Sequence, residues 1–379
     1  MPQDQETRCA IALSRLGHFS LADMLELYRR AGSAQQVVEH RDDIRSILPD
    51  ASDRLVNSLK GLDEALRRAD AELAFTNRYG IKTLTYNSPE YPRRLLECED
   101  APLVLFVMGR PDLNRAHVVS IVGTRHCSSY GADLVQTFCK DLQTLCPDVL
   151  IVSGLAYGID IQAHRQALAY HLDTAAVLAH GLDTIYPKAN ESTARQMVTQ
   201  GGLVTEFLSG TNADKLNFVR RNRIIAGLAD ATVVVESPAK GGSLITANIA
   251  QDYNRDVFAF PGSIGQPASE GCNRLIQRNK AALITCAEDV LHIMGWTAQA
   301  TQKTQKQEKN QPNTPNIANL SADEQRIVAL LYENNDMQVN TLAAQLGMHI
   351  SIAMSTLFTL EMKGLVRQLA GSVYHLRIT

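Results

Sequence analysis

The sequence predicts an α/β protein. Its central part is a Rossmann-like, doubly wound, mostly parallel sheet, flanked by a small all-α N-terminal domain and a winged-helix-like C-terminal domain. Between residues 81 and 293, short β-branched runs alternate with helical segments, a pattern typical of a parallel sheet covered on both faces. A polar stretch at 297–319 then precedes a last segment with its own helical pattern. The 379 residues are too many for one ordinary core, and we expect three domains.

The first domain is expected over residues 1–78. Apolar residues there recur at helical spacing, as in Leu21, Met24, Leu25 and Tyr28. The short helices are similar to SAM-like or helix-hairpin-helix modules. The basic hairpin glycines of a DNA-binding version are not evident, so we favour a packing or interaction role.

The second domain is expected over residues 79–296. Its predicted strands are 82–86, 103–108, 117–122, 149–152, 174–178, 203–206, 231–235, 257–260 and 283–285. No internal repeat with a period of 20 to 50 residues is present, which excludes a solenoid.

The remaining chain is expected to form a flexible linker, 297–319, and a winged-helix-like domain, 320–379. Ser321 and Glu324 have capping-box spacing, and a hairpin with a turn at Gly371 ends the pattern. The candidate recognition helix has Lys363 as its basic residue, near its end. Its apolar residues are expected in the core (Met354, Leu357, Phe358 and Leu360), so protein contact is favoured over groove reading.

Composition limits the function further. Lys and Arg number 37 against 40 Asp and Glu, a net charge of -3 that does not suit a protein coating duplex DNA, although a local basic groove is compatible with it. Apolar runs fall short of the ~20 residues of a membrane span, and no signal peptide is recognised, so we expect a cytoplasmic protein without membrane insertion. The seven cysteines include no C-x-x-C pair, and we expect no metal and no cofactor.

One segment concentrates positive charge. Arg220, Arg221 and Arg223 follow Phe218 at the start of an apolar helix, and no matching carboxylates stand beside them in the sequence. This pattern predicts a phosphate-binding element.

Glycine-rich loops follow several predicted strands. Gly123 and Arg125 follow one strand, Ser153 and Gly154 the next, and Lys188, Gly242 and Ser243 come after later ones. The carboxyl ends of parallel strands meet at one sheet edge, where backbone amides and helix N-termini can approach a phosphate. We therefore expect these loops and the arginine-rich helix to form one polyanion-binding groove.

The ordered series of motifs resembles the DNA-processing protein A family, also called DprA or Smf, over about residues 91–293. The matching segments are Ile121-Val122-Gly123-Thr124-Arg125, Ser153-Gly154-Leu155-Ala156-Tyr157-Gly158-Ile159-Asp160, Tyr186-Pro187-Lys188, Arg221-Asn222-Arg223-Ile224-Ile225-Ala226-Gly227-Leu228, Gly242-Ser243-Leu244-Ile245-Thr246-Ala247 and Gly271-Cys272-Asn273-Arg274-Leu275-Ile276.

The resemblance implies a protein that binds single-stranded DNA, protects incoming DNA and loads a RecA-type recombinase during natural transformation. It implies strand contacts from Gly123, Arg125, Ser153, Gly154, Lys188, Phe218, Arg221, Asn222, Arg223, Gly242 and Ser243. Phe218 would stack on a base, worth ~1–3 kcal/mol. The segment 272–284 would mediate a homodimer, with Leu275 and Ile276 at the interface.

Enzyme functions are less well supported. The sequence has no G-x-x-x-x-G-K-[ST] motif, and Asp160 with His164, one helical turn apart, is not favoured as an acid/base pair. The main alternative is a nucleotide-processing enzyme of the lysine-decarboxylase-like, phosphoribohydrolase type. The corresponding segment 238–246 lacks the glutamate of that family, so we expect binding without catalysis.

Overall fold

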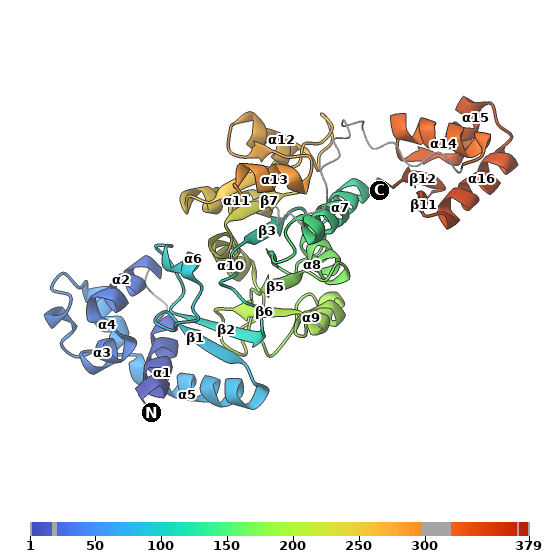
Figure 1. Cartoon of the computed structure of the whole chain (residues 1–379). Helices are drawn as coiled ribbons and strands as arrows, with labels where there is room; N and C mark the ends of the chain where they lie inside the picture. Colours follow the sequence, from blue (N-terminus) through green and yellow to red (C-terminus); the bar gives the residue numbers. More distant parts are fainter. Residues whose placement is uncertain (1, 17–20, 297–319, 370, 378–379) are drawn as a thin grey trace, which may run out of the picture. The chain divides into compact units, whose positions relative to one another are not determined.

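The computed structural model describes residues 2–16, 21–296, 320–369 and 371–377 (Figure 1). It divides into two compact units, Met1–Gln299 and Ala300–Thr379. The linker predicted at 297–319 lies outside the described residues.

The first unit is built on a nine-stranded sheet with the order β1-β2-β6-β5-β4-β3-β7-β8-β9. The strands are β1 (Lys82–Thr85), β2 (Val104–Gly109), β3 (Val118–Val122), β4 (Leu150–Ser153), β5 (Asp173–Val177), β6 (Gly201–Thr205), β7 (Ala231–Val234), β8 (Asp256–Ala259) and β9 (Ala282–Leu283). Strands β3 to β9 run parallel, and β1 and β2 join antiparallel at one edge. The predicted Rossmann-like α/β fold is confirmed.

Strand β3 lies at the point where the winding direction of the sheet reverses. The chain proceeds from β3 through β4 and β5 to β6 on one side, then returns to β7, which pairs with the other side of β3. Loops leave the carboxyl ends of β3 and its two neighbours in opposite directions at such a reversal. A crevice is therefore expected there.

Alternating residues of β3 divide between two hydrophobic cores. Val119 and Ile121 belong to the core covered by α7, α8 and α13, while Val118 and Val122 belong to the core covered by α9 to α12. The helices of this α/β part are α6 (Arg93–Leu96), α7 (Ser129–Leu145), α8 (Ile159–Ala169), α9 (Glu191–Met197), α10 (Lys215–Leu228), α11 (Gly242–Asp252), α12 (Glu270–Gln277) and α13 (Ala287–Ile293). The sheet is thus covered on both faces, as its β-branched strands predict.

The N-terminal helices pack beside the β1–β2 edge of the sheet (Figure 1). They are α1 (Pro2–Ser14), α2 (Leu21–Ala31), α3 (Ala34–Glu39), α4 (Asp53–Leu59) and α5 (Leu62–Tyr79), with a 3-10 turn η1 (Ile44–Ser46). Their apolar residues join the same core as α10 and β2. The Arg68 guanidinium also donates to the Ser209 carbonyl at 2.6 Å. The N-terminal helices therefore pack against the α/β core and form one compact unit with it.

In its described residues, the second unit contains three helices and a small antiparallel sheet. Its elements are α14 (Ala322–Glu333), β10 (Met337–Gln338), α15 (Val339–Leu346), α16 (Ile350–Met362), β11 (Val366–Leu369) and β12 (Val373–Leu376). Ser321 and Glu324 form the predicted capping box of α14, and Gly371 between β11 and β12 has φ 81°. The sheet order is β10-β12-β11, which confirms the winged-helix prediction.

The core of this unit differs from the prediction in one helix. Leu357 and Leu360 are fully buried, but Met354 is 51% and Phe358 63% exposed. Those two residues lie on the side of α16 away from α14 and α15, so they are not core residues of this unit.

In the part of the chain that the structure describes, no single helix has the length and apolar character to cross a membrane, although the bent pair α15 and α16 meets both criteria together.

Candidate nucleic-acid interface

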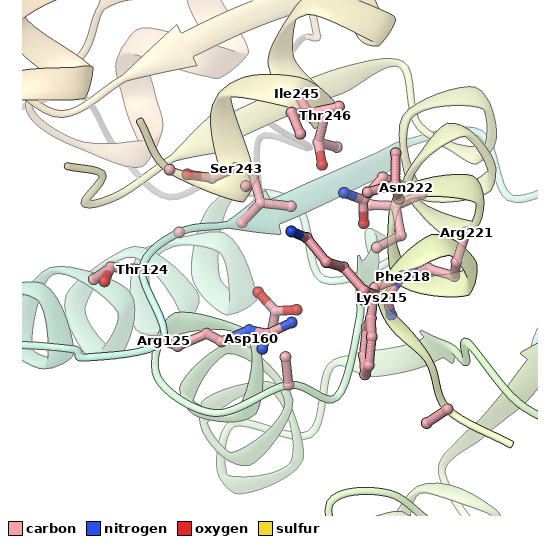
Figure 2. A pocket seen from close by; sticks show the side chains of 18 of the residues that line it. Thr124, Arg125, Asp160, Lys215, Phe218, Arg221, Asn222, Ser243, Ile245 and Thr246 are labelled. Atoms are coloured by element: carbon pink, nitrogen blue, oxygen red, sulfur yellow. The ribbon is translucent and has the colours of Figure 1, made fainter. Parts of the chain in front are cut away.

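A pocket of about 660 Å³ opens at the carboxyl edge of the sheet, where β3, β4 and β7 end. The loop after β3, the start of α8, the first turns of α10 and the start of α11 form its walls. Figure 2 shows the side chains that converge there: Thr124, Arg125, Asp160, Lys215, Phe218, Arg221, Asn222, Ser243, Ile245 and Thr246. The pocket therefore occupies the reversal point of the sheet, where ligands of doubly wound folds bind.

Helix α10 presents one face to this pocket. Asp214 caps the helix by accepting a hydrogen bond from the Asn217 amide at 2.8 Å. Lys215, Phe218 and Asn222 then line the pocket at helical spacing. The helix thus contributes a cation, an aromatic ring and an amide group to the same cavity.

Arg221 forms the floor of the pocket. Its Nη1 donates to the Gly154 carbonyl at 2.7 Å and also to the Val177 carbonyl, and the residue is 3% exposed. Burial lowers the pKa of Arg221 to about 10, while the nearby Asp160 carboxylate opposes that shift. The guanidinium remains charged at neutral pH, so it supplies a fixed positive charge beneath the cavity.

Asp160 lies beside this guanidinium in the first turn of α8. Burial raises the pKa of its carboxyl group above the ordinary value, while Arg221 and the amides of Ala156 and Gly154 act in the opposite direction. The carboxylate partly offsets the positive charge of the pocket. The net field felt by an anion therefore depends on the protonation of Asp160.

Two guanidinium groups lie close to the Phe218 ring. The Arg125 Cζ is 4.9 Å from the ring centroid and the Arg221 Cζ is 5.7 Å from it. The Tyr186 ring, 48% exposed, adjoins it with a centroid separation of 5.9 Å. Cations at these distances interact with the ring and hold it in place. The pocket thus combines a positioned aromatic surface with positive charge.

The start of α11 forms part of the pocket wall. Gly241 caps this helix without a side-chain hydrogen bond, and both Gly242 and Ser243 line the pocket. A Cβ placed on Gly242 would meet no atom within 4 Å, so this position faces open space. The N-terminus of α11 is therefore accessible to a phosphate or another anion.

Two of the three arginines in α10 point away from the pocket. Arg220 and Arg223 are three residues apart on the other side of the helix, where they pair with the Glu206 carboxylate at 3.1 and 2.5 Å. Arg223, which is predicted to contact the strand, is therefore not among the residues that line the pocket, and the arginine cluster has a carboxylate partner. Glu206 is distant in sequence, at the end of β6, and its burial requires a cationic partner.

Ser153 and Gly154 also differ from the prediction, because neither lines the pocket. The Ser153 hydroxyl is fully buried and donates to the Ile121 carbonyl at 2.6 Å. A Cβ on Gly154 would lie 2.5 Å from the Arg221 Cζ. Glycine is therefore required at 154 to let the Arg221 side chain lie across the backbone, so these residues position Arg221.

The other predicted residues divide into two groups. Gly123, Arg125, Phe218, Arg221, Asn222, Gly242 and Ser243 line the pocket. Lys188 is exposed on the 3-10 turn η2 (Lys188–Asn190), two residues after Tyr186, and is not one of the lining residues.

Leu275, in α12, is only 6% exposed and belongs to the core of its own chain, whereas Ile276 packs partly against that core. Of this pair, Ile276 is the residue with a surface available for self-association.

Sequence reasoning did not identify several pocket residues, notably Lys215, Tyr186, Val219 and Ile245. Lys215 and Val219 could have been found from helical spacing, since they share a face with Phe218 and Asn222. Tyr186 and Ile245 belong to segments that resemble the family, close to the predicted Lys188 and Ser243, but their approach to the pocket depends on the tertiary fold.

His164 and Glu236, two side chains that could act in catalysis, are hydrogen-bonded to neighbouring residues of the fold. His164 is fully buried, its Nδ1 lies 2.7 Å from the Thr174 hydroxyl, and burial lowers its pKa to about 3. Glu236 accepts hydrogen bonds from the Ser128 amide and hydroxyl at 3.0 and 2.5 Å. Among the described residues, no group of three or more His, Cys, Asp or Glu side chains is arranged to hold a metal.

Comparison with known proteins agrees with this geometry. The family model of DNA recombination-mediator protein A matches residues 82–295, and that of the DprA winged helix domain matches 311–372. The DNA processing protein DprA of Streptococcus pneumoniae is 44% identical over 201 residues, which cover 53% of this chain and 70% of that protein. Protein Smf of Escherichia coli is 43% identical over 206 residues, which cover 54% of each.

Solved structures extend the comparison. The X-ray structure of DprA from S. pneumoniae has a TM-score of 0.64 at 35% identity, covering 74% of this chain and 95% of that one. A second solved structure, of DNA processing protein A from Helicobacter pylori, is described as giving insights into its single-stranded DNA binding mode. It has a TM-score of 0.51 at 27% identity and covers 57% of this chain and 96% of that one. The chain therefore belongs to the DNA recombination-mediator protein A family, whose members include the DprA and Smf proteins.

Proposed function

We propose that this chain binds single-stranded DNA in the pocket at the carboxyl edge of its sheet and delivers it to a RecA-type recombinase. The observation that carries the proposal is the Phe218 ring, which lines a cavity of about 660 Å³ and has the Arg125 and Arg221 guanidinium groups 4.9 and 5.7 Å from its centroid. An aromatic surface with flanking cations is the combination that holds a base and its phosphates. The similar protein from H. pylori, whose structure is described as giving insights into its single-stranded DNA binding mode, supports this assignment.

The walls of the pocket suit different parts of a nucleotide. Phosphates would lie against Arg125, Lys215 and the amides at the start of α11, while a base would lie on Phe218 and beside Ile245. Stacking and phosphate contacts do not distinguish one base from another, so binding should show little sequence preference. Lys188 would contact the strand beyond the rim at Tyr186.

Binding is favoured over nucleotide hydrolysis. The two carboxylates of the pocket are Asp160, beside Arg221, and Asp214, which caps α10. Neither is placed as a free nucleophile, and Glu236 is held by Ser128. A site that binds a strand and leaves its bonds intact suits protection and delivery of DNA. The phosphoribohydrolase alternative requires release of a free base.

Delivery also requires surfaces away from the pocket. We propose that a homodimer forms through α12 around Ile276, which is only partly covered by its own chain. The strand would then be held in one region while the recombinase meets another.

Fluorescence anisotropy with single-stranded, duplex and mononucleotide ligands tests the proposal. We expect the single strand to bind most tightly, and no free base to be released from a nucleoside monophosphate. Each phosphate contact contributes a slope of ~0.7 to the salt dependence of log affinity, so Arg125→Ala should make the slope shallower by about that amount. Arg220→Ala is the matched control, because Arg220 pairs with Glu206 and does not line the pocket. Equal slopes for both variants would place the strand elsewhere.

The same variants test delivery. With a strand coated by single-strand-binding protein, the chain should shorten the lag before a RecA-type recombinase begins DNA-dependent ATP hydrolysis. Arg125→Ala should lengthen that lag, and Arg220→Ala should not. An unchanged lag with the wild-type chain would remove the loading role, and release of free base would favour the enzyme alternative.

A further inference from the structure

One buried carboxylate connects the N-terminal helices to the loop that leads into α10, here called the β6–α10 loop (206–214). Glu72, on α5, is 2% exposed, and its two oxygens accept hydrogen bonds from the Ser209 amide at 3.0 and 3.1 Å. Its Oε2 also accepts the Ser209 hydroxyl at 2.6 Å. Arg68, one turn earlier on α5, pairs with Glu72 at 2.8 Å and donates to the Ser209 carbonyl at 2.6 Å. The amide, the carbonyl and the hydroxyl of Ser209 are thus all bonded to α5.

This polar contact is of a different kind from the apolar packing around it. The N-terminal helices already share an apolar core with α10 and β2. Apolar burial is non-directional, whereas hydrogen bonds require defined distances and angles. A buried carboxylate is also unfavourable unless charges and hydrogen bonds satisfy it. Glu72 therefore fixes where Ser209 lies, which apolar packing alone would not do.

The segment directly after Ser209 forms one wall of the DNA pocket. Residues 213–215 line the pocket. The Asn217 side chain, in the first turn of α10, donates to the Asn212 carbonyl at 3.0 Å. The β6–α10 loop is therefore bonded to the helix that carries Phe218. A shift of Ser209 would reach that ring through this loop.

The β6–α10 loop is also bonded to a second loop of the pocket, here called the β5–η2 loop (178–187). The Gly210 amide donates to Asp183 Oδ1 at 2.9 Å. In the opposite direction, the Gly181 amide donates to the Thr211 carbonyl at 3.1 Å. The two loops thus hold each other beside Ser209.

The β5–η2 loop carries Tyr186, which lines the pocket beside Phe218. The Tyr186 amide donates to His180 Nε2 at 3.1 Å, and His180 is 1% exposed. Because Nε2 accepts, the ring proton is on Nδ1, which donates to the Gly181 carbonyl at 2.8 Å. Hydrogen bonds therefore lead from Glu72 through both loops to both aromatic rings of the pocket.

We propose that Glu72 is a positioning residue for the DNA pocket, through which the N-terminal helices set the placement of Phe218 and Tyr186. The inference rests on the proposed function, since the pocket is the place where a strand would bind. A binding site loses affinity when its supporting residues let it move by about 1 Å. A ligand that displaces α5 would therefore weaken strand binding, and a bound strand would reciprocally hold α5 in place.

Hydrogen–deuterium exchange of the full chain tests the positioning without DNA. Glu72→Gln leaves one oxygen to accept from both the amide and the hydroxyl of Ser209, and it removes the charge that pairs with Arg68. Exchange in the β6–α10 and β5–η2 loops should become about fivefold faster or more, as expected for the loss of one hydrogen bond.

Asp70→Asn is the matched control. Asp70 lies on the same helix and pairs with Arg8 of α1 at 2.6 Å, so its loss also removes an ion pair of the N-terminal helices. Ser209 is not among its partners. Exchange in the two loops should be that of the wild-type chain.

Fluorescence anisotropy then measures single-stranded DNA affinity for the same variants. Glu72→Gln should bind about fivefold more weakly, and Asp70→Asn should bind like the wild-type chain. Unfolding in urea identifies a purely structural role for Glu72. Such a role would lower the unfolding midpoint and leave the affinity of the folded protein unchanged.

Ser209 provides a second pair of variants that leave Glu72 in place. Ser209→Ala removes the hydroxyl that Glu72 accepts and should weaken strand binding by about threefold. Ser209→Thr keeps a hydroxyl and should restore most of the affinity. Circular dichroism checks that each variant is folded.

The outcomes separate this inference from the proposed function. Wild-type affinity in folded Glu72→Gln and Ser209→Ala would overturn the inference, even if exchange in the loops became faster. Equal losses of affinity in Glu72→Gln and Asp70→Asn would also overturn it. Absence of strand binding by the wild-type chain itself would instead overturn the proposed function, and this inference with it.

Discussion

The two sides of α10 place the same residue type in different surroundings. Arg223 faces Glu206, and its Nη2 lies 2.5 Å from the carboxylate. Arg221 is equally buried, but it donates to the main-chain carbonyls of Gly154 and Val177 at the floor of a cavity. A carbonyl holds a guanidinium in place without neutralising it, and the nearby Asp160 offsets the Arg221 charge only in part, whereas Glu206 pairs with Arg223 directly.

This difference separates stability from binding. An arginine neutralised by a buried carboxylate stabilises the fold and attracts no further anion. An arginine held by carbonyls keeps its charge, and a phosphate can bind nearby. Proximity of arginines in sequence is therefore insufficient to define a phosphate site. The side of the helix and the distribution of acids around it decide.

The largest expected effect comes from removing the carboxylate that neutralises the arginines on one side of α10. Glu206→Gln removes the carboxylate that faces Arg223 and should lower the free energy of unfolding of the first unit by about 3–5 kcal/mol. Trp296, the single tryptophan of the sequence, packs against His117 within this unit, so its fluorescence can follow unfolding in urea.

Glu191→Gln is the control for this stability effect. Glu191 pairs with Arg195 at 2.6 Å on the surface, where the side chain of Arg195 is 78% exposed. Its loss should cost less than about 1 kcal/mol. DNA affinity of the folded Glu206→Gln protein should be nearly unchanged. Equal stability losses for the two variants, or a strong loss of DNA affinity, would contradict the division between the two sides.

The binding side should show its largest effect at Phe218. Phe218→Ala should weaken single-stranded DNA binding by ~1–3 kcal/mol, about 5- to 150-fold, and Phe218→Tyr should retain most of the affinity. Leu216→Ala serves as the control, since Leu216 is 79% exposed on α10 and is not one of the pocket-lining residues. Anisotropy with an abasic strand sharpens the test. If Phe218→Ala is equally damaging there, the ring positions Arg125 and does not stack on a base.

The smallest effect concerns pH and Asp160. Because burial raises the pKa of Asp160, its carboxyl group takes up a proton at a higher pH in the folded chain than in the unfolded one. The unfavourable buried charge is present above that raised pKa and is lost as pH falls through it. Protonation leaves Arg125 and Arg221 unopposed, so phosphate affinity should rise as pH falls through that raised pKa, by less than about tenfold.

Asp160→Asn should bind more tightly at neutral pH and should show a flatter pH profile. The comparison is made at constant salt in a His126→Gln background, because His126 also lines the pocket and the substitution leaves Asp160 as the residue whose effect is compared. Parallel pH profiles with and without the Asp160→Asn substitution would show that this carboxyl group does not control the field in the pocket.

Much of the architecture is encoded locally. The bounds of each of the nine strands lie within two residues of its predicted run, because β-branched segments of this length between helical periods have few alternatives. The edge of the sheet that carries the pocket was also predictable, since strand ends and glycine turns can be recognised in sequence. Arg125, Phe218 and Gly242 follow directly from that reasoning.

The sequence by itself determined the order of helices and strands, the family, and the loops that gather at the carboxyl edge, because these depend on residue type and spacing. Only the tertiary structure decided that Arg221 faces the pocket while Arg223 faces Glu206. It also decided that Phe358 is exposed although it lies next to the buried Leu357. The physical reason is the same in both cases. Charge compensation and solvent exposure depend on which distant segments pack against each side of a helix, and adjacent residues on a helix point in different directions.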